Sequence, residues 1–156
     1  MIATTHLAVG AASGLAVQNL LYPDASAGEK VLISFVAGFL SHLVLDAVPH
    51  REYTADGLLL WTILAVEIAA VFLCVLSPHN NRLVNLIIFA GMAGGALPDF
   101  LGLSYRYFLQ WPLLAESGKT MHFFHFCRAP AGLELNYHIQ VLIALIAVIF
   151  VRSESA

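Results

Sequence analysis

Five long apolar segments constrain this chain more than any other feature. They cover roughly residues 2–22, 31–48, 57–76, 83–97 and 135–151, and the fourth has an alternative end near residue 103. A helix needs about 20 apolar residues to cross about 30 Å of hydrocarbon, and each segment reaches or approaches that length. The sequence therefore predicts an all-α fold, an integral membrane bundle of about five transmembrane helices.

Composition also favours a membrane protein over a soluble domain. Hydrophobic residues make up 60% of the chain and charged residues 11%, with a mean hydropathy of +0.82. A soluble domain carries about 25% charged residues, and one core could not bury this much apolar surface. The net charge of −3 is spread along the chain, and no basic run or basic–aromatic patch indicates nucleic-acid binding. We therefore expect membrane lipids, and not nucleic acid, around this chain.

Prolines close the first apolar segments, and one long connection separates the last two. Pro23, Pro49 and Pro78 stand just past the first three segments, where proline cannot continue the helical hydrogen bonds. The connection over residues 104–134 contains aromatic residues and the stretch MHFFHF, which is more typical of a functional or interfacial loop than of a linker. Nothing in the pattern divides the chain, so we predict one integral membrane domain over residues 1–156.

Five spans would gather most of the histidines and two acids at one membrane face. The N-terminus, the 49–56 connection and the 104–134 loop share this face, which we call face A. The 23–30 and 78–82 connections and the C-terminus share the other, face B. The residues that meet at face A are His6, His42, Asp46, His50, Asp99, His122 and His125, with His138 at the start of the last segment. No local motif requires these residues to lie at the same membrane face, so their shared location is the strongest functional indication in the sequence.

Basic residues favour face A as the cytoplasmic side. Those of face A are Arg51, Arg106, Lys119 and Arg128, and those of face B are Lys30, Arg82 and Arg152. Cytoplasmic loops of membrane proteins carry an excess of Lys and Arg. Face A has one basic residue more than face B. This difference predicts an inner or plasma membrane protein whose His/Asp cluster faces the cytoplasm.

The stretch SHLVLDAVPH supplies the first candidate metal ligands. His42, Asp46 and His50 are spaced by four residues, a step that turns a helix by only about 40° and so places them on one stripe. Pro49 ends the helix, which leaves His50 either as a further ligand or in an interfacial turn. Imidazole and carboxylate groups are ligands of Zn²⁺, and of Mn²⁺ or Fe²⁺ with more oxygen ligands. The alternative for His42 and Asp46 is a hydrogen-bonded pair inside the bundle.

Three further residues extend the candidate site. His122 and His125 form H-F-F-H, a spacing that suits two ligands from one turn or, alternatively, two interfacial residues among phenylalanines. Asp99 follows Leu97-Pro98 and is otherwise a residue of a helix-end turn. Because no nucleophile triad or phosphate-binding glycine loop is present, we expect a metal-activated water, with Asp46 and Asp99 as the catalytic carboxylates. The predicted ligands of a divalent metal, zinc first with manganese or iron as alternatives, are His6, His42, Asp46, His50, Asp99, His122 and His125.

Glycines predict where the helices pack most closely. They occur in VGAASG, as Gly10 and Gly14, and in AGMAGG, as Gly91, Gly94 and Gly95. Small residues let membrane helices approach each other at the backbone. In addition, Ala37-Gly38…Asp46 matches Ala90-Gly91…Asp99 at an offset of 53 residues, which would fit an ancient duplication of helix pairs.

Four motifs together resemble the YdjM-like family of predicted membrane-bound metal-dependent hydrolases. They are T-H-L-A-V-G, S-H-x-x-x-D, L-P-D and H-x-x-H, and they place His6, His42, Asp46, Asp99, His122 and His125 at the family's positions. The resemblance implies a multi-helix membrane fold and hydrolysis of an ester or phosphoester, with lipids among the candidate substrates. The family typically shows L-P-D-I-D-H where this chain reads A-L-P-D-F-L-G, and its S-H-x-x-x-D helix comes last. His50 could replace the ligand lost in this way.

Two other functions remain open. One is a non-catalytic subunit of a membrane complex, or an oligomer, in which the cluster binds a structural metal, a pigment or a lipid headgroup. The other is a proton-coupled transporter that uses Glu67, which lies roughly 15 Å into the third segment and apart from the cluster. Glu67 would then be a proton relay or substrate gate, whereas its structural alternative is a pairing with Asn85 or Gln18.

Overall fold

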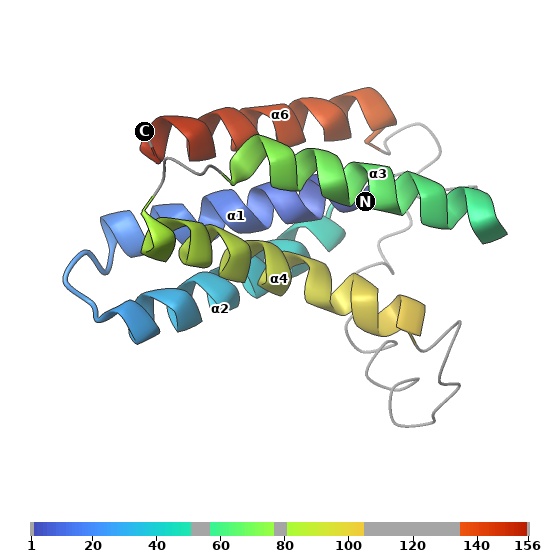
Figure 1. Cartoon of the computed structure of the whole chain (residues 1–156). Coiled ribbons are helices and arrows are strands. Elements are labelled where there is room, and N and C mark those ends of the chain that lie inside the picture. The colour runs from blue at the N-terminus through green and yellow to red at the C-terminus, as the bar shows by residue number, and fades with distance from the viewer. Residues whose placement is uncertain (1, 51–56, 77–80, 105–134, 156) are drawn as a thin grey trace.

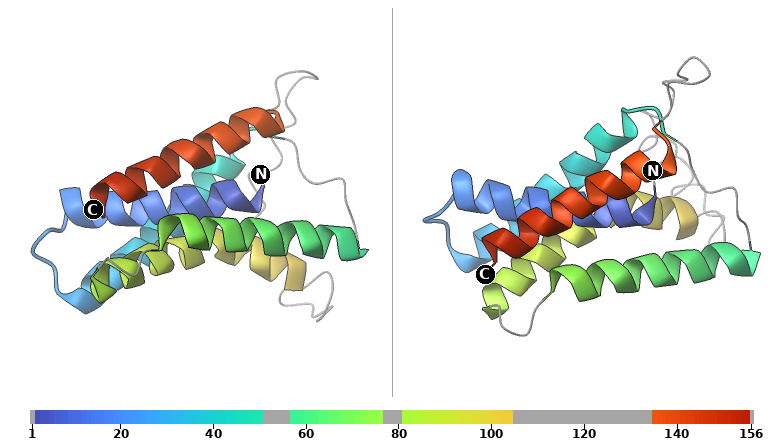
Figure 2. Two further views of the ribbon diagram at one scale, coloured as in Figure 1. Left: turned by 45° about the horizontal axis from the view of Figure 1, so that its top comes forward. Right: turned by 90° about the horizontal axis from the view of Figure 1, so that it is seen from above.

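The computed structural model describes residues 2–50, 57–76, 81–104 and 135–155. Its helices are α1 (Ala3–Leu20), α2 (Ala27–Asp46), α3 (Gly57–Val75), α4 (Arg82–Ser104) and α6 (Tyr137–Glu154). Successive helices run up and down, so that α1, α3 and α6 point one way and α2 and α4 the other (Figures 1 and 2). In the described part of the chain no strand occurs, and the one isolated bridge pairs His50 with Leu135. The predicted all-α bundle of five helices is confirmed.

Four of these helices, α2, α3, α4 and α6, are long and apolar enough to cross a membrane. Large apolar side chains cover their outer surfaces, among them Leu58 and Leu73 of α3, each 83% exposed. Such a surface suits hydrocarbon, because a soluble bundle would turn these side chains inward. The loop predicted over residues 104–134 lies, from residue 105 on, outside the described residues.

The remaining helix, α1, is less apolar because it lies at the centre of the bundle. It packs against all four other helices, and Figure 2 shows it enclosed by them. Thr5, His6 and Gln18 on α1 are buried against protein. Polar groups that face neighbouring helices can find partners there, whereas the same groups facing lipid could not. Of the five predicted apolar segments, four form helices long and apolar enough to cross a membrane, and the first forms the inner helix α1.

Helix α4 continues through its proline. It includes Pro98 and ends at Ser104, so the longer of the two predicted ends is the one observed. Proline removes one backbone donor, and membrane helices tolerate this loss where neighbouring helices pack closely. As a result, Asp99 lies on a helix and not in a helix-end turn.

Helices α1, α2 and α4 approach one another at the backbone. A Cβ atom on Gly10 would lie 2.5 Å from the carbonyl oxygen of Gly91, and one on Gly95 would lie 2.5 Å from that of His6. Real Cβ atoms do not come so close to another atom, so only glycine fits these positions. The predicted close packing at the glycines is confirmed, and it brings together the three helices that carry most of the candidate site.

Candidate metal centre

Two adjacent parallel helices present matched residues to the site. Ser34 Oγ on α2 donates to the Ile87 carbonyl on α4 at 2.6 Å, and the His42 ring meets the Gly95 carbonyl at 2.7 Å. In both pairs the two residues are 53 positions apart in the sequence, which is also the offset of the sequence match between the two segments. Because parallel helices in a constant register keep equal depth, Asp46 of α2 and Asp99 of α4, also 53 residues apart, come to one level of the bundle.

His6, His42 and Asp46 form the buried part of the site. His6 lies near the start of α1, and His42 and Asp46 lie one turn apart at the end of α2. Asp46 Oδ1 is 3.3 Å from His6 Nε2, and Asp46 Oδ2 is 3.0 Å from His42 Nε2. The three side chains are at most 1% exposed. One carboxylate therefore contacts both imidazoles in the interior of the protein.

Asp99 completes the group from α4. Its Oδ2 lies 3.9 Å from His6 Nε2 and its Oδ1 lies 3.9 Å from His42 Nε2. Its side chain is 32% exposed, unlike the other three. Asp46 is thus sealed within the site, and Asp99 is its partly exposed member.

His42 is held in one orientation by the backbone of α4. Its Nδ1 lies 2.7 Å from the Gly95 carbonyl oxygen. A carbonyl only accepts, so Nδ1 is the donor in this contact, and Nε2 is the ring nitrogen that faces the carboxylates. Histidines that bind metals usually donate their other ring nitrogen to such an acceptor, which fixes the tautomer and the ring orientation.

The ring nitrogens that face the carboxylates are close to oxygen atoms without being aligned for hydrogen bonds. Neither nitrogen of His6, nor Nε2 of His42, makes a hydrogen bond within the described residues. The two rings stack with centroids 4.0 Å apart and planes at 27°. Buried polar atoms normally have a partner, so nitrogens that converge without one suggest a common ligand.

A divalent cation fits this donor set. His6, His42 and Asp99 each offer one ligand atom, and these atoms all lie within 4.8 Å of one another. Two imidazoles with carboxylates are the ligand types of Zn²⁺, Mn²⁺ and Fe²⁺. A dication would also balance the charges of Asp46 and Asp99, which are costly to keep in a low-dielectric interior.

Of the remaining predicted ligands, His50 is the one that the structure describes, and it is not part of this group. His50 Nδ1 contacts the Val48 carbonyl oxygen at 2.6 Å, because α2 ends at Asp46 and does not carry His50 onto the same stripe. Of the two alternatives for His50, the position in a turn is the one observed. His138 is exposed in the first turn of α6. His122 and His125 lie outside the described residues.

Gln140, which the sequence analysis did not single out, connects the helices that surround the site. It is fully buried on α6, and its Oε1 accepts a hydrogen bond from Ile2 N at 2.8 Å. Its backbone carbonyl accepts from Thr5 Oγ1 at 3.0 Å, and its Nε2 donates to the Leu135 carbonyl at 3.0 Å. A single glutamine among apolar residues of the last segment was the available signal.

Glu67 is closer to the site than expected. Its Oε2 accepts hydrogen bonds from Thr4 N at 3.0 Å and from Thr4 Oγ1 at 2.7 Å. Thr4 belongs to the first turn of α1, where backbone N–H groups have no partner in the helix and the dipole favours an anion. The expectation that Glu67 is remote was wrong, because α1 begins beside the middle of α3 and not beside its end (Figure 1).

Comparisons of this chain with protein-family models, with curated proteins and with solved structures gave no match. What the site can do is therefore inferred from its own chemistry. The described residues form a buried group of two histidines and an aspartate that could hold a metal ion, with a second aspartate in contact with both histidines.

Proposed function

We propose that this protein is a membrane-embedded, divalent-metal-dependent hydrolase that acts on an ester or phosphoester, with a lipid as the favoured substrate. The observation that carries the proposal is the convergence of His6, His42 and Asp99 on one buried point. Three protein ligands with one open position are the usual arrangement of a catalytic zinc site, whereas structural sites are closed by four.

The exposure of the carboxylates supports a catalytic site over a structural one. Asp46 is sealed beneath the histidines, and Asp99 is partly exposed at the rim. A substrate or water would therefore approach on the Asp99 side.

The chain's own residues have separate roles in this proposal. A bound divalent cation would polarise the substrate and lower the pKa of a water molecule. His6, His42 and Asp99 would hold it, and the Gly95 carbonyl would keep Nε2 of His42 in the ligating tautomer. Asp46 is placed to accept a proton, because its oxygens lie within 3.3 Å of both histidines at the centre of the site.

The resemblance to the YdjM-like family agrees with this proposal. Four of the six residues that carry the resemblance, His6, His42, Asp46 and Asp99, are among those that meet in the described site. We propose zinc as the metal, with manganese or iron as alternatives, since two carboxylates would also suit a metal that prefers oxygen.

Metal analysis of the purified protein tests the proposal directly. We expect about one zinc, manganese or iron ion per chain after purification in detergent without chelator. His42→Ala and Asp99→Ala should lose most of it, whereas His138→Ala, which removes an exposed histidine near the same end, should retain it. A folded, metal-free wild-type protein would contradict the proposal.

Hydrolysis is tested separately from metal binding. The metal-loaded protein should cleave p-nitrophenyl phosphate or p-nitrophenyl butyrate, and Asp46→Asn should lower the turnover by about 100-fold or more, the usual contribution of a general base. Metal retention without hydrolysis of either compound, or of phosphatidic acid in mixed micelles, would favour the non-catalytic alternative. That alternative is supported by how completely His6, His42 and Asp46 are sealed.

A further inference from the structure

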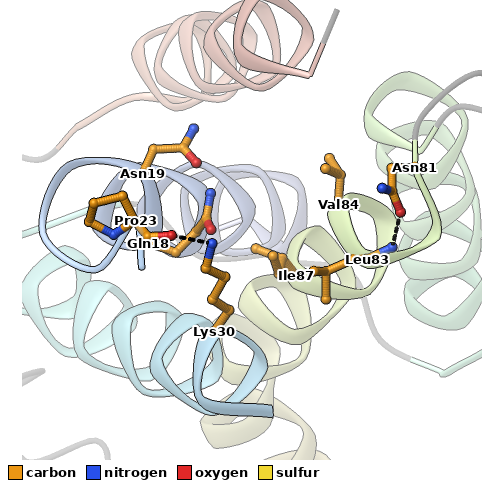
Figure 3. A pocket seen from close by; sticks show the side chains of 8 residues that line it. All are labelled: Gln18, Asn19, Pro23, Lys30, Asn81, Leu83, Val84 and Ile87. Atoms are coloured by element: carbon orange, nitrogen blue, oxygen red, sulfur yellow. Dashed lines mark hydrogen bonds between the residues drawn. The ribbon is translucent and has the colours of Figure 1, made fainter. Parts of the chain in front are cut away.

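A second polar site lies at the opposite end of the bundle. A pocket of about 290 Å³ opens between the end of α1 and the beginnings of α2 and α4. Its polar lining includes Gln18, Asn19, Lys30 and Asn81, and its apolar wall includes Val84 and Ile87 (Figure 3). None of these residues belongs to the candidate metal centre.

Lys30 brings an uncompensated positive charge to this pocket. It is partly buried, and its ammonium donates to the Pro23 carbonyl oxygen at 2.6 Å. Within the described residues Lys30 has no ion pair, and the neighbouring carboxylate of Glu29 is instead bound by Ser26. An ammonium group has three N–H donors, so two remain for a ligand.

Gln18 supplies the second indication of a ligand. Its side chain is 6% exposed, lines the pocket and makes no hydrogen bond to any described residue. A primary amide has two donors and two acceptor positions, so a polar molecule in the pocket could form hydrogen bonds with it.

The surroundings of the two residues favour an anion. Helices α2 and α4 both begin at this end, where the side chain of Ser26 caps α2 and that of Asn81 accepts a hydrogen bond from Leu83 N of α4. Among the described residues no carboxylate lines the pocket; that of Glu154 accepts a hydrogen bond from Asn19 Nδ2 at 3.2 Å and is not part of the lining. A cation and amide donors without a lining carboxylate suit a phosphate group.

We propose that this pocket binds the phosphate group of an anionic phospholipid headgroup. The lipid is favoured over free phosphate because the pocket lies at the ends of helices long and apolar enough to span a membrane, where headgroups are located. The apolar wall of Val84 and Ile87 suits the glycerol and first methylenes of such a molecule. This site is independent of the proposed hydrolase activity.

Lipid binding to the full chain in dodecyl maltoside tests the proposal. Native mass spectrometry should show phosphatidylglycerol retained on the wild-type protein in preference to phosphatidylcholine. Lys30→Met and Gln18→Glu should each weaken phosphatidylglycerol binding at least about tenfold, as expected for loss of a charge-assisted hydrogen bond or its replacement by a like charge. Helical content by circular dichroism should be unchanged in both variants.

Arg152→Met is the matched control, because Arg152 lies at the same end of the bundle, on α6, and does not line the pocket. It should bind phosphatidylglycerol like the wild type. An equal loss in Arg152→Met would show non-specific charge attraction and overturn the proposal. If inorganic phosphate stabilised the protein as much as phosphatidylglycerol does, the pocket would be assigned to the free anion and the proposal would be overturned. Equal binding of phosphatidylglycerol and phosphatidylcholine would also overturn it.

Discussion

His6 and His42 reach the candidate metal centre under different constraints. The ring of His42 is fixed by the Gly95 carbonyl, so its position follows from the contact between α2 and α4. The ring of His6 makes no hydrogen bond within the described residues, so its position depends on how the first turn of α1 is held. Gln140 and Glu67 hold that turn through Ile2, Thr5 and Thr4. We therefore assign both as positioning residues for His6.

Gln140→Leu tests this assignment at the level of one residue. The substitution keeps the volume but leaves the Ile2 N–H and the Leu135 carbonyl without their partner. Each buried group left unsatisfied costs about 1–3 kcal/mol, so for the two groups we expect a loss of roughly 2–6 kcal/mol in stability. Metal affinity should fall as well, because His6 lies in the adjoining turn. Leu142→Ala, on an exposed position of the same helix, should change the melting temperature and metal affinity little; equal effects of the two variants would contradict the assignment.

At the level of elements, the site depends on the contact of three helices at their glycines. Gly91 lies at the centre of this contact, with Gly10 of α1 on one side and Gly38 of α2 on the other. The glycine backbones let ligand atoms of His6, His42 and Asp99 come within 4.8 Å of one another. Helix separation and metal binding should therefore change together.

Gly91→Ala should separate the helices. The added Cβ would meet the carbonyl of Gly10, which is backbone and cannot move aside as a side chain would. Overpacking costs about 1–3 kcal/mol, and here the shift would also widen the distance between His6 and Asp99. We expect a lower melting temperature and weaker metal binding. Gly28→Ala is the control, because no atom lies within 4 Å of its added Cβ, and alanine there should leave both unchanged or raise stability slightly.

These elements also show what can be read from the sequence. The helices and their glycine contacts could be predicted, because apolar length and small residues are local signals. The meeting of His6, His42, Asp46 and Asp99 followed from the alternating topology. The partners of Glu67 and Gln140 could not be predicted, because they depend on how far α1 is shifted along α3 and α6. That shift is set by side-chain packing across the bundle and leaves no periodic pattern in the sequence.

At the level of the whole molecule, the two ends of the bundle differ in chemistry. One end holds the His/Asp group, and the other holds the pocket with Lys30 and Gln18. The apolar surface of the four outer helices lies between them. Loop charges bias the orientation of such a molecule, and the predicted topology assigns one more basic residue to the His/Asp end.

Cysteine labelling measures this orientation. In a Cys74→Ser, Cys127→Ser background, Val48→Cys would mark the His/Asp end and Gly28→Cys the opposite end; Val48 is 39% exposed, and a Cβ on Gly28 would be unobstructed. If the His/Asp end is cytoplasmic, a membrane-impermeant maleimide added to intact cells should label Gly28→Cys and leave Val48→Cys unlabelled until the cells are opened. The reverse pattern would place the metal centre outside.

Adding two lysines after Glu154 should shift part of the population to the opposite orientation. The two ends differ by a single basic residue in the predicted topology, so the charge difference between them would then change sign.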